Sequence, residues 1–249
     1  MFETTMHGEI AVVTMTHGKA NALDTEFCEA IVGKLDDLRR TARGVVWTGQ
    51  GKIFSAGVDL RRILDAGEAY GHTFLPALSR AFKALYAFPH PMVTAINGHA
   101  LAGGCIIAIA GDHRVMTDAN ASIGVPELRV GVPLPSMAVE MIRQVTGIHA
   151  PRVLYRGERH DPQQALAFGL VDELAPADEV LNRAIAAAED LCSLAPESFA
   201  VTKWQLREQV FLRLHELEDE EREVERLWAL PETHDRIRAY VDANIKSSK

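Results

Sequence analysis

The alternation of apolar and polar positions predicts strands in the first part of the chain, separated by helices. Apolar, β-branched runs indicate strands at 9–15, 44–48, 92–96 and 113–117. Apolar residues at every third or fourth position predict amphipathic helices that begin near Asp24 and include Phe74. Strands alternating with helices are typical of an α/β fold with parallel strands and right-handed crossovers.

The pattern changes to purely helical periodicity in the last third of the chain. Before that point we expect a hairpin of 2–6 with 9–15, a helix at 103–110, short strands at 121–123 and 170–174, and helices at 135–146, 149–156 and 162–168. The tail from 178 to 245 carries Trp204 and Trp228, which must pack on a neighbouring subunit or on the chain's own core. We therefore expect an α/β core over 1–190 and a helical region over 191–249.

Composition narrows the classes of function. The 249 residues carry a formal net charge of −8, which argues against nucleic acid as a partner. The three cysteines lack metal-ligand spacing and their number is odd, so we expect no metal site and a reducing, cytoplasmic location. The chain shows no signal-peptide pattern and no apolar run of the roughly 20 residues that span a bilayer, so we expect no membrane partner.

Two glycine-bearing turns are the most informative feature for chemistry. They occupy residues 54–60 (FSAGVDL) and 97–104 (NGHALAGG), and each follows a predicted strand and opens onto a helix. Such a turn leaves backbone N–H groups unpaired and aimed at one point. Two turns that each offer an N–H to one oxygen make an oxyanion hole. The alternative is steric, because glycine also permits positive φ and close packing.

Several charged residues are candidates for a site. Glu127 lies among apolar residues and glycines, where a raised pKa would suit a general base; a salt bridge to Arg129 or a surface position is the simpler alternative. A basic patch for a phosphorylated ligand is one interpretation of four other residues, and solvated helix charges the other: Lys52, Arg61, Arg62 and Lys203. Asp112 and Arg114 are most simply a structural ion pair. Serine-nucleophile, dinucleotide and nucleoside-triphosphate motifs are absent from the sequence.

Four segments together resemble the enoyl-CoA hydratase/isomerase (crotonase) superfamily: 54–60, 97–104, 126–131 (PELRVG) and 165–172 (ALAFGLVD). They come in family order, and the resemblance covers nearly the whole chain. It implies a spiral core of ββα units, with C-terminal helices that assemble homotrimers or dimers of trimers. It also implies an acyl-CoA thioester as substrate and no cofactor, since coenzyme A is part of that substrate.

The resemblance also assigns roles to individual positions. The N–H groups of Val58 and Gly103 would bind the thioester oxygen, and Glu127 would be the catalytic acid–base group. The positions implied to contact substrate are Ala56, Leu60, Arg61, Gly104, Ile106 and Lys203, of which Lys203 is the weaker phosphate candidate and could act across a subunit boundary.

One departure from the family pattern favours a particular reaction. Family members that hydrate a double bond carry two glutamates, but the first of these positions is Ile106 here and only Glu127 remains. A single base suffices to move a double bond, so the sequence favours a Δ3,Δ2-enoyl-CoA isomerase. Leu134 stands where dehalogenases and dienoyl isomerases place an aspartate. Hydratase activity, decarboxylation, hydrolysis and a non-catalytic acyl-CoA-binding role remain alternatives.

Overall fold

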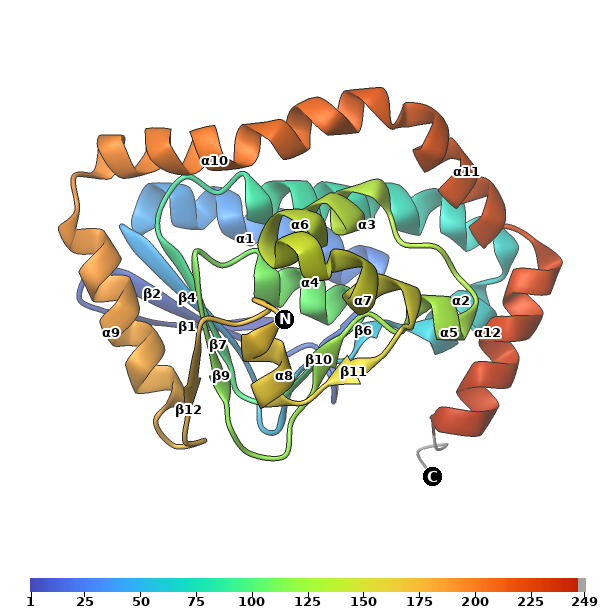
Figure 1. Ribbon diagram of the computed structural model, residues 1–249, viewed down its shortest axis with the longest axis horizontal. Coiled ribbons are helices and arrows are strands. Elements are labelled where there is room, and N and C mark those ends of the chain that lie inside the picture. Colours follow the sequence, from blue (N-terminus) through green and yellow to red (C-terminus); the bar gives the residue numbers. More distant parts are fainter. Residues whose placement is uncertain (246–249) are drawn as a thin grey trace.

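A six-stranded sheet in the order β1-β2-β4-β7-β9-β12 lies on one side of the molecule (Figure 1). The computed structural model describes residues 1–245, apart from the side chain of Glu68. The strands are β1 Phe2–His7, β2 Ile10–Met15, β4 Gly44–Gly49, β7 Met92–Ile96, β9 His113–Thr117 and β12 Glu173–Ala175. The predicted hairpin is confirmed as the antiparallel pair β1–β2, and all other neighbours in this sheet are parallel.

Shorter strands form two smaller sheets beside the large one. A four-stranded sheet has the order β11-β10-β8-β5, and β3 pairs with β6. Their bounds are β3 Ala22–Leu23, β5 Ile53–Ser55, β6 Gly57–Val58, β8 His99–Leu101, β10 Ile123–Gly124 and β11 Arg159–His160. In successive units a strand of the large sheet is followed by a short strand and then a helix, which confirms the expected spiral of ββα units. The strands expected at 121–123 and 170–174 begin later, at Ile123 and Glu173.

The helices of the core follow the predicted apolar spacing. They are α1 Thr25–Thr41, α2 Leu60–Ala66, α3 Gly71–Tyr86, α4 Gly103–Ile109, α5 Glu127–Val130, α6 Ser136–Thr146, α7 Ala150–Tyr155 and α8 Pro162–Ala167, with 3-10 turns at Glu68–Tyr70 and Gly147–His149. Asp24 caps α1 by accepting a hydrogen bond from Phe27 N at 2.7 Å. Every residue of α4 is buried, so this helix forms the centre of the core.

The large sheet has an apolar layer on each face because its side chains alternate. Val45 and Trp47 of β4 belong to the main core cluster with the helices, whereas Val46 faces the opposite layer. That second layer is covered by α9 (Val180–Ser193) through Val180, Ala184 and Ala188. Burial on both faces explains why the strands read as continuous apolar runs.

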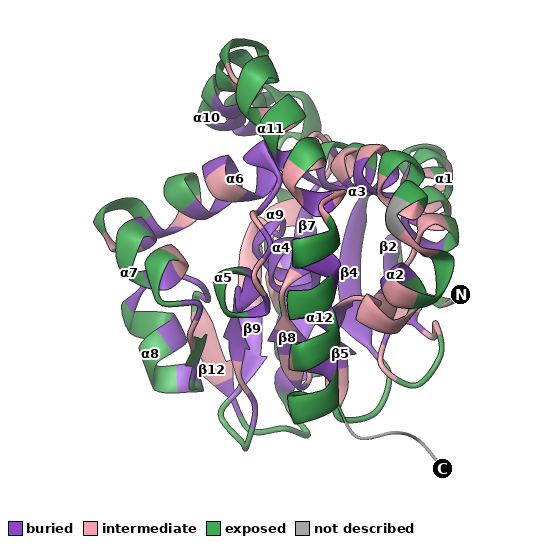
Figure 2. Ribbon diagram, turned by 90° about the vertical axis from the view of Figure 1, so that its right-hand side faces the viewer, coloured by how far each residue is buried: buried purple, intermediate pink, exposed green. Residues whose placement is uncertain are grey.

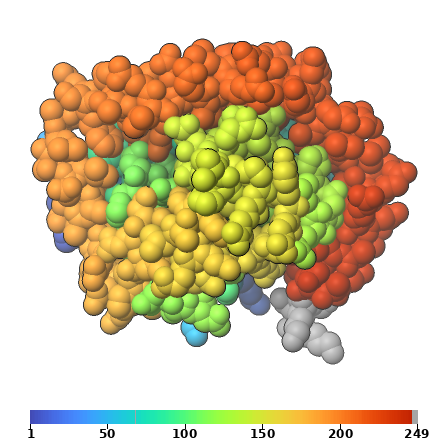
Figure 3. Space-filling model, viewed as in Figure 1, coloured from blue at the N-terminus to red at the C-terminus, as the bar shows by residue number. Residues whose placement is uncertain are grey.

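The tail is helical, as the sequence predicts. After α9, the helices are α10 Pro196–Glu216, α11 Glu218–Trp228 and α12 Pro231–Asn244. In Figures 1 and 3 these helices, orange to red, run along the top and down the right side of the molecule. The two tryptophans differ: Trp228 packs on the chain's own core with 3% of its surface exposed, whereas Trp204 on α10 remains 47% exposed. The division at residue 190 stays a prediction.

Candidate active site

The two glycine turns lie against each other at one edge of the smaller sheet. Strands β5 and β8 are parallel neighbours within these segments, so the glycines that follow them, Gly57 and Gly103, emerge on the same side. Gly57 has φ +84°, and a Cβ added there would be 2.4 Å from Leu101 O and 3.1 Å from Gly103 N. A side chain at position 57 is therefore excluded by both conformation and space. The same close approach places the start of α4 beside the first turn.

The glycines of the second turn also lie close to their neighbours. A Cβ at Gly104 would be 2.5 Å from Ser55 O, and one at Gly103 would be 2.5 Å from Leu23 Cδ1. Ala102, just before them, has φ 53° and ψ −130°, a conformation that L-residues rarely adopt. Such a backbone costs on the order of 1–3 kcal/mol and often occurs at functional sites. The steric and chemical interpretations of the turns are thus compatible, and no sequence signal indicated the strain at Ala102.

A cavity of about 290 Å³, the central cavity, opens beside these turns. Its walls come from the two turns, the segment around α5, the loop before β3 and the C-terminal helices, and they are mainly apolar. The lining residues are Ala20, Ala22, Ala56, Val58, Asp59, Leu60, Arg61, Leu101, Ala102, Pro126, Glu127, Val130, Val132, Arg159, Trp228, Tyr240 and Ile245.

The structure thus brings five of the sequence-derived candidates to one cavity: Ala56, Val58, Leu60, Arg61 and Glu127. Gly103, Gly104 and Ile106 are not part of the lining; Gly103 and Gly104 follow directly after the lining residue Ala102, and Ile106 is buried in the core on the same helix.

Glu127 is the first residue of α5 and points an unpaired carboxylate atom into buried surroundings. The residue is 8% exposed, and its Oε2 is buried with no hydrogen-bond partner among the described residues. Burial raises the pKa of this carboxyl to about 8, and a hydrogen bond with its own backbone opposes the shift. The alternative of a salt bridge to Arg129 is wrong, because Arg129 pairs with Glu158 and donates to Arg156 O. Glu127 is therefore a carboxyl poised to exchange a proton near neutral pH.

The second acid in the cavity wall has a structural task. Asp59 caps α2, where its Oδ1 accepts hydrogen bonds from Arg61 N at 3.1 Å and Arg62 N at 3.0 Å. These bonds engage one of its two carboxylate oxygens and hold the side chain at the start of α2. Of the two acids in the cavity wall, Asp59 is half-buried and caps a helix, whereas Glu127 is buried.

Two arginines lie where the C-terminal helix meets the cavity. Arg61 donates from Nη2 to Ile245 O at 3.2 Å, just after α12. Arg159, which the sequence analysis did not identify, donates from Nη2 to Tyr240 OH at 3.4 Å. Sequence patterns gave no signal for Arg159, because it joins the site through a two-residue strand and a contact with a distant helix.

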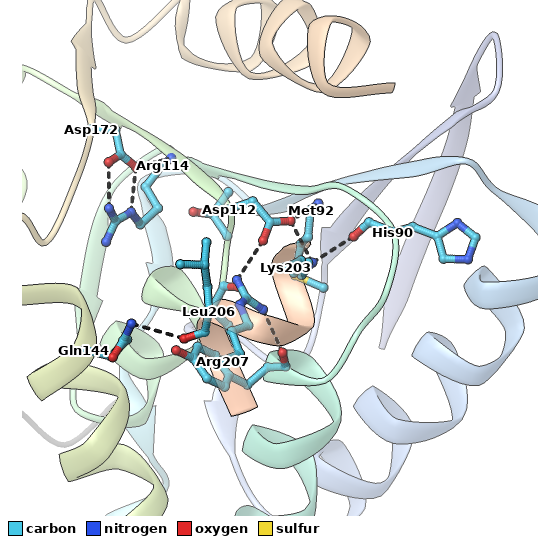
Figure 4. A network of polar contacts seen from close by, with 12 residues as sticks. His90, Met92, Asp112, Arg114, Gln144, Asp172, Lys203, Leu206 and Arg207 are labelled. Atoms are coloured by element: carbon cyan, nitrogen blue, oxygen red, sulfur yellow. Dashed lines mark hydrogen bonds and ion pairs between the residues drawn. The ribbon is translucent and has the colours of Figure 1, made fainter. Parts of the chain in front are cut away.

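Lys203 lies away from the central cavity of its own chain, and its contact with substrate across a subunit boundary stays a prediction. It is buried on α10, and its Nζ donates to Asp112 Oδ2 at 2.7 Å and to His90 O at 2.9 Å (Figure 4). Burial lowers the pKa of this ammonium group, and the nearby Asp112 carboxylate opposes the shift. Lys203 does not line the central cavity.

The expected ion pair between Asp112 and Arg114 is also wrong. Asp112 accepts from Lys203 and from Arg207 Nη2 at 2.8 Å, while Arg114 makes a two-pronged contact with Asp172 at 2.6 Å on each prong. Figure 4 shows the contacts of Asp112 with Lys203 and Arg207 next to the pair of Arg114 and Asp172. The first contacts connect α10 to the core, and the second connects the residue before β12 to β9.

The described residues hold no cluster of three or more histidine, cysteine or acidic side chains able to bind a metal ion. In the same part of the chain, none of the helices combines the length and the apolar character required to cross a bilayer.

Comparison with known proteins gives the family. Residues 5–240 match the family model described as Enoyl-CoA hydratase/isomerase. The chain belongs to this family. A Thermus thermophilus protein provisionally named an enoyl-CoA hydratase is 37% identical over 79% of this chain and 79% of its own length. Mitochondrial enoyl-CoA delta isomerase 1 of Rattus norvegicus is 32% identical over 80% of this chain and 70% of its own.

Comparison with solved structures agrees with the family assignment. The crystal structure of human mitochondrial delta3-delta2-enoyl-CoA isomerase superimposes with a TM-score of 0.92 at 25% identity, covering 97% of both chains. The crotonase fold expected from the sequence is confirmed. The relatives' names divide between hydratase and isomerase, so the choice of reaction depends on the site itself.

Proposed function

We propose that this chain catalyses Δ3,Δ2-enoyl-CoA isomerisation with Glu127 as its single acid–base group. The supporting observation is the enclosed carboxyl of Glu127 beside the two glycine turns, with a pKa raised by burial to about 8. A base of this kind matches proton transfer to and from carbon near neutral pH. The proposed reaction needs no cofactor other than the coenzyme A moiety of the substrate.

In the proposed reaction, Glu127 removes a proton from C2 of a 3-enoyl-CoA. The electrons move into a dienolate whose negative charge lies on the thioester oxygen, where the N–H groups of Val58 and Gly103 donate hydrogen bonds. Loss of one such donor costs about 2.7–4 kcal/mol in enzymes where it has been measured. The protonated Glu127 then returns the proton to C4, so the double bond moves and no proton is gained or lost overall.

Ile106 supports isomerisation over hydration. Addition of water requires one group to deprotonate the water and another to deliver or share a proton at carbon. In the family pattern the second carboxylate stands at position 106, and here that position holds an isoleucine that is 1% exposed. An apolar side chain there disfavours a bound water, so proton return to carbon is the favoured outcome.

The test compares the products from two substrates. The purified protein is incubated with a 3-enoyl-CoA and, separately, with a 2-enoyl-CoA, and the products are identified by mass and by the position of the double bond. We expect a 2-enoyl-CoA of unchanged mass from the first substrate. A 3-hydroxyacyl-CoA, heavier by one water, would favour the hydratase alternative, and release of free coenzyme A would favour hydrolysis. Decarboxylation needs a separate substrate, an acyl-CoA with a free carboxylate, because neither enoyl-CoA can lose carbon dioxide.

Substitution of Glu127 tests its role. Glu127→Gln should lower the isomerisation rate by about 10²–10⁴ and leave acyl-CoA binding intact, because the amide keeps the shape and loses the proton acceptor. Glu140→Gln is a matched control, since Glu140 is equally enclosed at 7% exposed but lies on α6 and pairs with Arg143. An active Glu127→Gln variant would exclude the proposed mechanism.

A further inference from the structure

The central cavity is lined by Tyr240 of α12 and by one residue on each side of that helix in the sequence. Figure 2 shows α12 in front, with α2 and α5 at its sides. Trp228 precedes the helix, Ile245 follows it, and both line the cavity. A helix of 14 residues is about 21 Å long, so the two lining residues mark well-separated ends.

The end near Ile245 is open and cationic. Ile245 is exposed, its carbonyl oxygen accepts a hydrogen bond from Arg61, and the nearby Tyr240 contacts Arg159. A ligand with several phosphate groups fits this end by charge, since arginine is suited to phosphate oxygens.

The end near Trp228 is closed and apolar. The indole is 3% exposed, and it bonds to Pro133 O, directly after the apolar lining residue Val132. Glu127 and Val58 line the same cavity, so a thioester between the two ends places its acyl chain toward Trp228. Apolar walls that exclude water favour an alkyl chain there.

Trp228 is held firmly in this position. Its Nε1 donates to Pro133 O at 3.0 Å, on the segment that follows α5. Its ring lies 6.5 Å from that of Phe74 on α3, centroid to centroid. Thr233 Oγ1 at the start of α12 also donates to Leu227 O at 2.7 Å, which fixes the turn between α11 and α12. With these contacts on several sides, the indole forms a rigid wall, because rotating it away would break them.

We propose that Trp228 forms the end wall of the acyl channel and sets the longest acyl chain that the protein binds. This inference rests on the proposed function in one respect, namely that the ligand is an acyl-CoA. It assigns a role in specificity to the C-terminal helical region of the same chain. Trp228 would contact the far end of the substrate and take no part in proton transfer.

The inference predicts a break in the dependence of affinity on chain length. Each buried methylene should tighten binding about fourfold until the chain reaches the indole, and further methylenes should then add nothing or weaken binding. Removing the indole should move this break toward longer chains.

The experiment is a calorimetric titration of the full chain with saturated acyl-CoAs from butanoyl- to dodecanoyl-CoA. Wild type is compared with Trp228→Ala and with Trp228→Phe, which keeps an aromatic ring and should move the break less. Trp204→Ala is the matched control, because Trp204 is exposed on α10 and distant in sequence from the cavity wall. Circular dichroism verifies folding, and the phenylalanine variant keeps the test decisive if the alanine variant does not fold.

We expect the break to shift by several methylenes in Trp228→Ala, by fewer in Trp228→Phe and by none in Trp204→Ala. The same break in all variants, or no break in wild type, would overturn the role of Trp228. If wild type binds acyl-CoAs with the expected break and fails to isomerise 3-enoyl-CoA, the proposed reaction is wrong and the end wall stands. Failure to bind any acyl-CoA would overturn both.

Discussion

Glu127 combines two properties that oppose each other in a folded chain: it can ionise, and it is enclosed by apolar groups. Burial favours the neutral carboxyl, so near neutral pH the unliganded site holds a proton on Glu127 for most of the time. A base of this kind abstracts a proton better than an ordinary carboxylate, because the proton affinity of the carboxylate rises with its pKa. In the proposed reaction, the same residue must lose its proton before it can act.

The pH dependence of the reaction follows from this shift. Because the pKa of Glu127 in the folded chain is raised to about 8, the ionised fraction, and with it kcat/KM, should rise about tenfold per pH unit below that value and level off above it. The measurement is kcat/KM for a 3-enoyl-CoA across the neutral and mildly alkaline range, with Glu127→Gln as the control whose residual rate should lack this limb. A rise in kcat/KM centred near pH 4.5, the ordinary pKa of a glutamate, would contradict the burial of the catalytic carboxyl.

At the scale of elements, the site depends on the contact between two strand–turn–helix units. Gly57 lies where the first turn meets Leu101 and the start of α4, and no side chain fits there. Elsewhere in the same unit, Gly51 also has positive φ, at +68°, but a Cβ there would meet nothing within 4 Å. Both positions therefore require a positive φ, but only position 57 also lacks the space for a side chain.

Comparing Gly57→Ala with Gly51→Ala separates these two requirements. Both substitutions strain the backbone by about 1–2 kcal/mol. Only Gly57→Ala should also push the two turns apart and lower kcat by about 10²–10³, the effect of losing one oxyanion donor. Activity is measured with a 3-enoyl-CoA and stability by urea unfolding. Equal losses of kcat in both variants would show that the contact between the turns has no special role in catalysis.

The local parts of this site could be predicted from the sequence, and the distant parts could not. Glycine turns after apolar runs, and an acid among apolar residues, are patterns within a few positions, so the sequence indicated the turn at Gly57 and Glu127, and the family resemblance then named Val58. Arg159 and Trp228 join the cavity through tertiary packing, and no local spacing records that. The buried contacts of Lys203 could not be predicted for the same reason: its partner Asp112 is 91 positions away in the sequence.

The charges on α10 illustrate how tertiary context overrides sequence expectation. Lys203 and Arg207 are buried on a helix whose outer face is solvated, and both donate to Asp112. Lys203 also donates to His90 O, and Arg207 also donates to the carbonyl oxygens of Tyr86 and Ala110. Buried charges require such partners, because an unpaired one is strongly destabilising. A lysine that the sequence suggests as a phosphate ligand is thus an anchor of the tail.

At the scale of the whole molecule, the C-terminal helices contribute to the wall of the central cavity in their own chain, through Trp228 of α11 and Tyr240 of α12. The outer surface of α10 nevertheless carries exposed apolar side chains, among them Val201, Trp204 and Leu212, whose spacing places them on one face of the helix. Exposed apolar faces of this kind are typical of subunit interfaces. The homotrimer or dimer of trimers expected from the sequence stays a prediction, and α10 is its candidate contact.

Trp204→Glu tests this contact and its independence from the site. A charge in an apolar interface is expensive to bury, so we expect the mass measured by light scattering to fall from that of a trimer or hexamer toward that of a single chain. Acyl-CoA binding should persist within a few-fold, because Trp204 is not part of the cavity wall. Met6→Glu, a similar charge on the exposed strand β1, is the control and should leave the mass unchanged. An unchanged mass for Trp204→Glu would exclude α10 as the interface, and loss of binding together with the drop in mass would mean that the neighbouring subunit supports the site.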